Sequence, residues 1–534
     1  MRLYKYPVLL CIAVAAIASS CKKTLVAANI DPETLYSVDP GQQFQTASNA
    51  LLNSYEWYAD YYRDLNPWMQ YTVPGGGNSG SFNVPSAFNT RYTNFYNGVG
   101  NALADIPHLI SKMSTAEQAA RVYENDIATI YMAFYAFYVS DINGSIPYTQ
   151  AFEARYGGTL TPVYDTQENL FDTLDVQIKA AVKSLETTQS VSQVLYGSQY
   201  DGFFGSANNE VLEWIKAGNA LRLKIAMRLM NQEPSVLQAI ASDVLSDANQ
   251  MSGVADSWMM SQGIEWISGT ADNTNPANFL ATEPLVNFMQ STGDPRLTMF
   301  YRPVTGTTST YIGSPTSPDS CTTSANQALY AAGAFSPIQH KLFAPGYIEP
   351  EDGGVATTGT SFIPLLTYAE YCFIRADLAA RGITSDVAEN WYNSGVTASI
   401  QFYDQRCTAA LIGIYTPVTQ TQINNYLAAP GIAYNPTIGV QQIDCQAYLD
   451  FFRQPSEAWA WWKRTGYPNT TSVVPWSTLT YSSQVLPLPR RASFTAPLTS
   501  APNYTNTMAA YTAMEAQSGF GALADDQGRI WWDQ

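Results

Sequence analysis

The first half of the chain carries apolar residues at the spacing of amphipathic helices. Residues 116–141 form one long apolar run, and Ser114 with Glu117 ahead of it has the pattern of a capping box. Asp165 with Glu168 has the same pattern ahead of a second run. One face of that run carries Phe171, Leu174, Ile178, Ala181 and Leu185. The spacing predicts two long helices that pack these faces into a core.

A third helix is predicted over residues 209–230, after which the periodicity is lost. From Ser252 to Thr360 the chain is rich in Gly, Pro, Thr, Ser and Asn. A stretch of that length without periodicity is typical of long ordered loops, which often carry binding sites. The last seventy residues also read as irregular, with Pro and Thr throughout.

Helical patterning returns between these two irregular regions. The predicted helices are 362–381, closed by Gly382; 389–405, capped by Asp386 and Glu389; 443–453; and 455–463. No linker divides the chain, so we expect one large α-rich domain over residues 44–534. Paired helices with small residues at their contacts indicate tetratricopeptide-like hairpins with long irregular loops, although no regular sequence period is readable.

Composition excludes several classes of protein. Charged residues make up 13% of the 534 residues, and the net charge is −17. So acidic a chain repels phosphate backbones, and nucleic acid is not expected as a partner. His108 and His340 are the only histidines, and the common catalytic and metal-binding motifs are missing. We expect no cofactor; the acidity leaves bound calcium open, although no EF-hand-type loop is present.

The N-terminus has the anatomy of an export signal over residues 1–20. A cationic start precedes an apolar stretch from Val8 to Ala18. The fourteen residues 7–20 are too few to cross a hydrocarbon core of roughly 30 Å as a helix. Small residues directly before Cys21 indicate a lipobox, in which that cysteine is acylated. Residues 21–43 would then form a lipid-anchored tether; ordinary signal cleavage before Cys21 is the alternative.

Four further cysteines remain in the exported chain: Cys321, Cys372, Cys407 and Cys445. An oxidising compartment permits up to two disulfides among them, in three full pairings. Cys372 lies at a helical core position with Ala369 and Ala376, so a buried free thiol is at least an equal alternative there.

The segment SEAWAWWKRTGYP (456–468) places three tryptophans within four positions. In a helix Trp459 and Trp462 share a face, while Trp461 points roughly 200° away from Trp459. Indoles on opposing faces cannot form one flat stacking surface, so we interpret them as structural packing. The Trp531–Trp532 pair is likewise predicted to hold the C-terminus against the body.

Candidate ligand contacts are therefore sought in the aperiodic segments. Sugar rings stack their C–H faces on aromatic planes, while Asn, Asp and Thr side chains bind the hydroxyls. The segments around residues 55–82 and 252–301 offer that mixture. The candidates are Trp68, Tyr71, Trp258, Trp266 and Tyr301.

Several segments together resemble the SusD/RagB-type nutrient-binding lipoproteins of Bacteroidota outer membranes. In order they are DINGSIPYTQAF (141–152), PVYDTQENLFDTL (162–174), EWIKAGNALRLKIAMRL (213–229), DPRL (294–297), AEYCFIRADLAARG (369–382), SEAWAWWKRTGYP (456–468) and RIWWD (529–533). With the lipobox, the resemblance covers nearly the whole chain. The terminal WWD is typical of the SusD-like branch.

The resemblance implies four tetratricopeptide-like hairpins that carry a loop-built ligand face. It also implies a partner, a SusC-type TonB-dependent transporter, to which a surface-anchored lipoprotein delivers an oligosaccharide or a peptide. We expect an outer-membrane location facing the cell surface, but Lys22–Lys23 depart from the acidic residues frequent after the lipidated cysteine. The ligand loops diverge in this family, so no ligand residue follows from the resemblance.

Two other classes of function compete with a binding protein. A glycosidase needs two carboxylates about 5 Å or 6.5–9.5 Å apart. The 44 acidic residues could supply such a pair, but nothing in the sequence positions one. A helical scaffold could hold a transporter complex without touching nutrient. We expect a non-catalytic binding protein.

Overall fold

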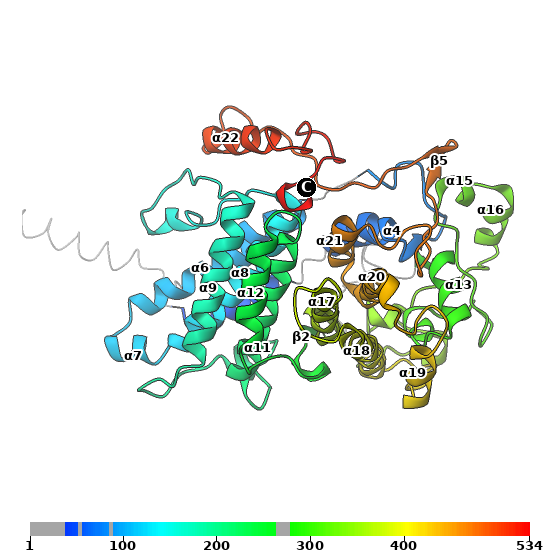
Figure 1. Ribbon diagram of the computed structural model, residues 1–534, viewed down its shortest axis with the longest axis horizontal. Helices are drawn as coiled ribbons and strands as arrows, with labels where there is room; N and C mark the ends of the chain where they lie inside the picture. Colours follow the sequence, from blue (N-terminus) through cyan, green and yellow to red (C-terminus); the bar gives the residue numbers. More distant parts are fainter. Residues whose placement is uncertain (1–37, 52–55, 85–88, 263–277) are drawn as a thin grey trace, which may run out of the picture.

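The computed structural model describes residues 38–51, 56–84, 89–262 and 278–534, which are mainly helical (Figure 1). The longer helices of the first half are α2 (Pro40–Ala50), α6 (Gly100–Ser111), α8 (Val122–Asn143), α9 (Gln167–Leu185), α11 (Glu210–Ala226) and α12 (Pro234–Leu245). Those of the second half are α13 (Glu283–Thr292), α17 (Tyr368–Ala380), α18 (Ala388–Ala409), α20 (Gly439–Asp450), α21 (Pro455–Thr465) and α22 (Tyr504–Glu515).

Consecutive helices pack side by side. In the first half α6 packs on α8, α8 on α9, α9 on α11 and α11 on α12; in the second half α17 packs on both α18 and α20, and α20 on α21. Figure 1 shows these as two groups of helices, and α11 contacts α17 where the groups meet. The predicted mainly-α fold of tetratricopeptide-like hairpins is confirmed.

Shorter elements fill the regions between the long helices. The strands of the described residues form antiparallel pairs: β1 (Thr72–Pro74) with β3 (Phe279–Ala281), β2 (Trp258–Gln262) with β4 (Ser361–Leu366), and β5 (Thr480–Tyr481) with β6 (Gln484–Val485). The short α-helices are α4 (Asn66–Trp68), α5 (Thr90–Asn94), α7 (Thr115–Ala119), α10 (Gly197–Tyr200), α14 (Leu297–Phe300), α15 (Pro318–Cys321), α16 (Ser324–Ala331) and α19 (Gln420–Leu427). Two π-helical stretches, η1 (Trp57–Leu65) and η2 (Phe95–Val99), lie near the N-terminus.

The predicted apolar face of α9 lies in the core. Its members are all buried: Phe171, Leu174, Ile178, Ala181 and Leu185. Removing each large side chain from water contributes about 1.5–3 kcal/mol. Close packing across this face depends on Gly218 of α11, where a Cβ atom would stand 2.6 Å from Val182 and 3.2 Å from Ile130. A larger residue at position 218 would push α11 away from both neighbours.

Two predicted helix starts differ from the observed ones. Ser114 and Glu117 do form a capping box, but it opens only the short α7. The carbonyl of Ala120 then accepts from the Val194 N–H at 2.7 Å, which interrupts the helical ladder before α8. The second helix is capped by Thr166, because the Asp165 carboxylate accepts from the backbone N–H groups of residues 148 and 149 instead.

The helix predicted over 362–381 begins with a strand. Residues 361–366 form β4, which is buried throughout and pairs with β2. A continuous apolar run fits a buried strand as well as a helix, and the pairing partner lies about a hundred residues earlier. Only α17, closed by Gly382 at φ 70°, is helical. The last seventy residues also contain α22, which the sequence pattern missed.

The four cysteines beyond the N-terminus are free and buried, so the structure contains none of the disulfides that the sequence left open. The predicted signal and Cys21 lie outside the described residues, while α2 begins at Pro40, inside the segment predicted as a tether. None of the described helices combines the length and apolar character needed to cross a membrane.

Candidate functional site

An open cavity of about 1030 Å³, here called the loop pocket, lies among the irregular segments of the second half. Three stretches of chain line it: residues 298–311, 337–354 and 414–422. The volume is at the upper end of the range of small-molecule sites. Two of the three stretches fall inside the aperiodic region 252–360, where the sequence predicted a ligand face.

Arg302 holds two walls of the loop pocket together. Its backbone N–H donates to the carbonyl of Pro337 at 2.9 Å, which fixes its position. The guanidinium donates to both carboxylate oxygens of Glu351 at 3.0 Å and lies 3.2 Å from Glu349. Burial opposes ionisation of Glu351, but the hydrogen bonds from Arg302 outweigh it and hold the pKa of that carboxyl below its ordinary value.

The segment that carries Arg302 is anchored by the buried Arg296 of the DPRL motif. Arg296 is fully buried, and its guanidinium donates to both oxygens of Asp294 at 3.0 and 2.8 Å. It also donates to the Gln446 side chain of α20 at 2.7 Å and to Ser399 of α18 at 3.1 Å. These bonds tie the start of the pocket segment to the helical scaffold, so the motif has a structural role.

Two half-buried tyrosines supply the aromatic surface of the loop pocket. The ring of Tyr347 is backed by the ring of His340, with centroids 4.4 Å apart. Burial, and then nearby Glu349, raises the pKa of the Tyr347 phenol. Burial likewise raises the pKa of Tyr311. Both hydroxyls therefore stay protonated at neutral pH and can donate to a ligand oxygen. The neutral polar lining comprises Thr298, Thr305, Thr307, Thr308, Thr416 and Gln422.

Four of the five aromatic residues predicted to contact ligand lie in the core. Trp68, Tyr71, Trp258 and Tyr301 are each 0% exposed. The Trp68 indole donates to the Phe82 carbonyl at 3.0 Å, Tyr71 stacks on Tyr448 with centroids 4.6 Å apart, and the Trp258 ring lies 5.1 Å from that of Trp214.

These contacts overturn the prediction for the four residues, because no ring face is left for a sugar. Tyr301 uses its hydroxyl to bond the carbonyl of Tyr71 at 2.8 Å. The fifth candidate, Trp266, lies outside the described residues. The sequence pattern did not single out Arg302, Tyr311 or Tyr347 as ligand contacts. Tyr347 lies in the Pro- and Gly-rich stretch FAPGYIEPEDGG (343–354), and this was the sequence feature that could have indicated a loop residue.

The tryptophan motif packs inside the protein, as predicted. Trp459 and Trp461 are 1% and 2% exposed, and Trp462 is half-buried. Trp459 donates to the Pro489 carbonyl at 2.8 Å and Trp461 to Glu457 at 2.9 Å. The C-terminal pair is also confirmed as an anchor, since Trp532 is buried and the adjacent Asp533 pairs with Arg490.

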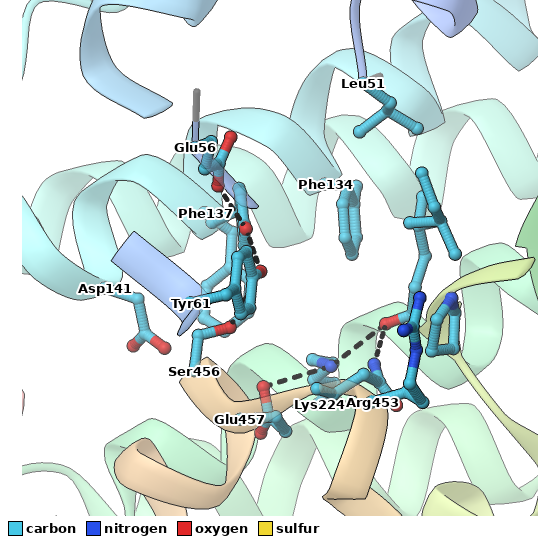
Figure 2. Close-up of a pocket in the computed structure, with 15 residues that line it drawn as sticks. Leu51, Glu56, Tyr61, Phe134, Phe137, Asp141, Lys224, Arg453, Ser456 and Glu457 are labelled. Carbon is cyan, nitrogen blue, oxygen red and sulfur yellow. Dashed lines mark hydrogen bonds and ion pairs between the residues drawn. The ribbon is translucent and has the colours of Figure 1, made fainter. Parts of the chain in front are cut away.

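A second, enclosed cavity of about 40 Å³ lies where α8, β4 and α21 meet (Figure 2). Glu56, Tyr138, Tyr61 and Ser456 form a chain of hydrogen bonds along one side of it. Lys224 also lines the cavity and lies beside Glu457, with Nζ 3.1 Å from its carboxylate. Such a volume holds at most a few water molecules, whereas ligand sites need some hundreds of Å³. We therefore assign this cavity to the structure of the core.

Among the residues that the structure describes, no three His, Cys, Asp or Glu side chains are placed to hold a metal ion. The acidic side chains that line the loop pocket, Glu349 and Glu351, both pair with Arg302 instead.

Comparison with known proteins identifies the fold and the family. Residues 32–494 match the model of a SusD-like family described as starch-binding and associating with the outer membrane. A search of the curated proteins finds no match. Among solved structures, a chitin-binding protein is 20% identical with a TM-score of 0.72, over 93% of this chain and 100% of that one.

Two further solved structures are described as SusD homologues. A chitin-binding homologue from Flavobacterium johnsoniae is 18% identical with a TM-score of 0.67, over 93% of this chain and 98% of that one. A homologue from Bacteroides fragilis is 19% identical with a TM-score of 0.68, over 92% and 100%. The family match spans most of the chain, and these structures share its fold. The chain therefore belongs to the SusD-like family of outer-membrane-associated, starch-binding proteins.

Proposed function

We propose that this protein captures an oligosaccharide in the loop pocket and does not act on it chemically. The observation that carries the proposal is a pocket of about 1030 Å³ with two half-buried tyrosines and a rim of threonines, on a scaffold of the SusD-like family. Tyrosine rings can stack on sugar C–H faces, and hydroxyl groups can bind sugar hydroxyls. The chitin-binding relatives make N-acetylated glycans the first ligands to test.

The charges of the loop pocket favour binding over hydrolysis. A glycosidase needs one carboxyl whose raised pKa keeps it protonated near neutral pH. Glu349 and Glu351 both pair with Arg302, and the pKa of Glu351 is lowered rather than raised. The Glu351 carboxyl is thus not suited to act as a general acid. Incubation with chitohexaose and maltoheptaose should release no shorter product by chromatography.

The alanine variant of Tyr347 is expected to bind its oligosaccharide at least about tenfold more weakly, a loss of about 1.4 kcal/mol. The ring forms part of the pocket wall, and its loss removes a stacking surface. Calorimetric titration with chitohexaose and maltoheptaose measures the effect. Tyr481→Ala, which removes an exposed tyrosine on the β5–β6 hairpin, is the matched control and should bind as the wild type does.

Either of two results would contradict this assignment. One is unchanged affinity in Tyr347→Ala when the wild type binds an oligosaccharide, since the ligand would then sit elsewhere. The other is binding of peptides but of no glycan in a screen of the wild type, which would favour the peptide-binding alternative.

Anchoring and delivery complete the proposed role. We propose that Cys21 is acylated, that the protein faces the cell surface, and that it passes its ligand to a SusC-type TonB-dependent transporter. The outer-membrane association of the family and the export-signal pattern of residues 1–20 support this arrangement.

Cys21→Ser is expected to abolish acylation, which mass spectrometry of the purified protein detects as the loss of the acyl mass. A pull-down of the wild type from native membranes in mild detergent should recover a TonB-dependent transporter in near-equal amount, as mass spectrometry can measure. An acylated, membrane-bound wild type that recovers no transporter would count against delivery and favour a free-standing binder.

A further inference from the structure

A separate cavity of about 500 Å³, here called the helix pocket, lies on the helical half of the protein. It forms where α6, α8 and α9 lie side by side, and the segment 148–153 contributes its rim. Ala104, Ala128 and Ala180 each line it from one of the three helices. Their short side chains leave the space open, so the pocket follows from the sequence at the helix contacts.

The charged lining of the helix pocket is entirely acidic. Of the residues that line it, all of them described, only Asp126 and Glu153 carry a charge and none is basic. Two of the neutral polar groups are engaged, since the Tyr148 hydroxyl donates to Gln177 at 2.6 Å and the Thr149 hydroxyl donates to Asp165 at 2.7 Å. Phe152 and Met132 add apolar and polarisable surface. The pocket therefore combines a negative charge with an apolar wall.

Asp126 is a buried carboxylate without a counter-ion. It is 9% exposed, and its Oδ2 atom meets no hydrogen-bond donor among the described residues. Two other buried carboxylates do have a counter-ion, since Asp141 faces Arg228 at 2.9 Å and Glu370 faces Lys224 at 2.8 Å. The Ser184 side chain is hydrogen-bonded to the Asp126 carboxyl, but a buried charge without a counter-ion remains costly, and a cation that enters the pocket would reduce that cost.

Burial raises the pKa of Asp126 to about 6. The carboxyl is consequently ionised for the most part at pH 7.5 and can attract a cation there. The nearby Tyr148 and Phe152 rings offer a further electrostatic attraction, since a cation near an aromatic face gains about 0.5–2 kcal/mol.

We propose that the helix pocket binds a primary ammonium or guanidinium group on a short apolar stem, with the Asp126 carboxylate as its counter-ion. The stem lies against Met132 and the aromatic rim. The same chemistry is presented by a lysine or arginine side chain of a protein partner and by a free small amine. This inference does not depend on the loop pocket or on its ligand.

Calorimetric titration of the full mature chain tests the proposal at pH 7.5 and low ionic strength. The probes are n-butylammonium, n-butylguanidinium and the tripeptide Gly-Lys-Gly with its N-terminus acetylated and its C-terminus amidated, and uncharged n-butanol is the matched ligand control. We expect saturable binding of the cations, none of n-butanol, and at least a tenfold loss in Asp126→Asn. Asp172→Asn, which removes an exposed charge from α9, should bind as the wild type does.

A second variant separates pocket occupancy from charge. Ala180→Leu places bulk at the exposed rim of the helix pocket and should also weaken binding, with no loss of thermal stability. Tighter binding of the tripeptide than of n-butylammonium would identify a basic side chain of a protein partner as the occupant. Tighter binding of n-butylammonium would identify a free amine. Absence of saturable binding of all three cations, or full affinity in Asp126→Asn, would overturn the proposal.

Discussion

Replacing Arg228 with methionine is expected to reduce the free energy of unfolding by about 3–5 kcal/mol. The Arg228 side chain is fully buried and donates to both oxygens of Asp141 at 3.0 and 2.9 Å. It also donates to Glu457 at 2.9 Å. Methionine fills a similar length but leaves two carboxylates in the core without this cation. Breaking a buried pair on one side is far more costly than losing an exposed one.

The expected loss is large because the ion pairs connect the two helical groups. Asp141 is on α8 and Arg228 lies two residues after the end of α11, whereas Glu457 is on α21. Burial alone would raise the pKa of Glu457, but Arg228 and then Lys224 outweigh burial and lower it to about 2. The carboxylate is therefore ionised throughout the neutral range and depends on both cations.

Urea denaturation at pH 7 measures the effect. Arg155→Met is the matched control, because the Arg155 side chain is 45% exposed and its ion pair with Asp105 is long, at 4.0 Å. This variant should lower the free energy of unfolding by less than about 1 kcal/mol. The double variant Asp141→Asn, Arg228→Met should recover part of the loss by removing one stranded charge. An unchanged midpoint in Arg228→Met would show that the network does not stabilise the junction.

The helical scaffold could be predicted from the sequence because its information is local. The spacing of Phe171, Leu174 and Ile178 defines one face of α9 without knowledge of any other segment. Pro455 marks the start of α21 for the same reason, since proline is accepted in the first turn of a helix. The opposed faces of Trp459 and Trp461 were enough to place both indoles in the core.

The individual residues of the candidate site could not be predicted, because the exposure of an aromatic side chain depends on residues that are distant in the sequence. Tyr71 is buried by Tyr448, nearly four hundred residues away, and Trp258 by Trp214 and the β2–β4 pairing. In an aperiodic segment, the sequence does not distinguish an aromatic residue that faces solvent from one that is buried in the core. The sequence therefore located the region of the loop pocket, but the residues that line it emerged only from the fold.

The stability of the protein is also expected to depend on pH through the buried Lys463. This side chain of α21 is 4% exposed, and its Nζ has no hydrogen-bond partner among the described residues. It lies 3.7 Å from the ring centroid of Trp459 and 4.7 Å from that of Trp532. Burial lowers its pKa to about 7, and although Asp533 and Asp141 oppose the shift they do not cancel it.

Lys463→Met is expected to stabilise the protein at pH 7 and to have little effect near pH 10.5. The unfolded chain binds a proton at Lys463 below its ordinary pKa of about 10.4, but the folded protein does so only below about 7. The free energy of unfolding of the wild type therefore falls as the pH is lowered from about 10 to 7, and the loss due to Lys463 is complete below pH 7. The full difference is at most about 4–5 kcal/mol, and methionine removes it.

Urea midpoints of the two proteins between pH 6 and 10 give the difference directly. Lys183→Met on α9, where the side chain is 79% exposed, is the control. A difference that stays constant across this range would mean that Lys463 keeps its proton in the folded protein, held between the two indoles by their attraction for the charge.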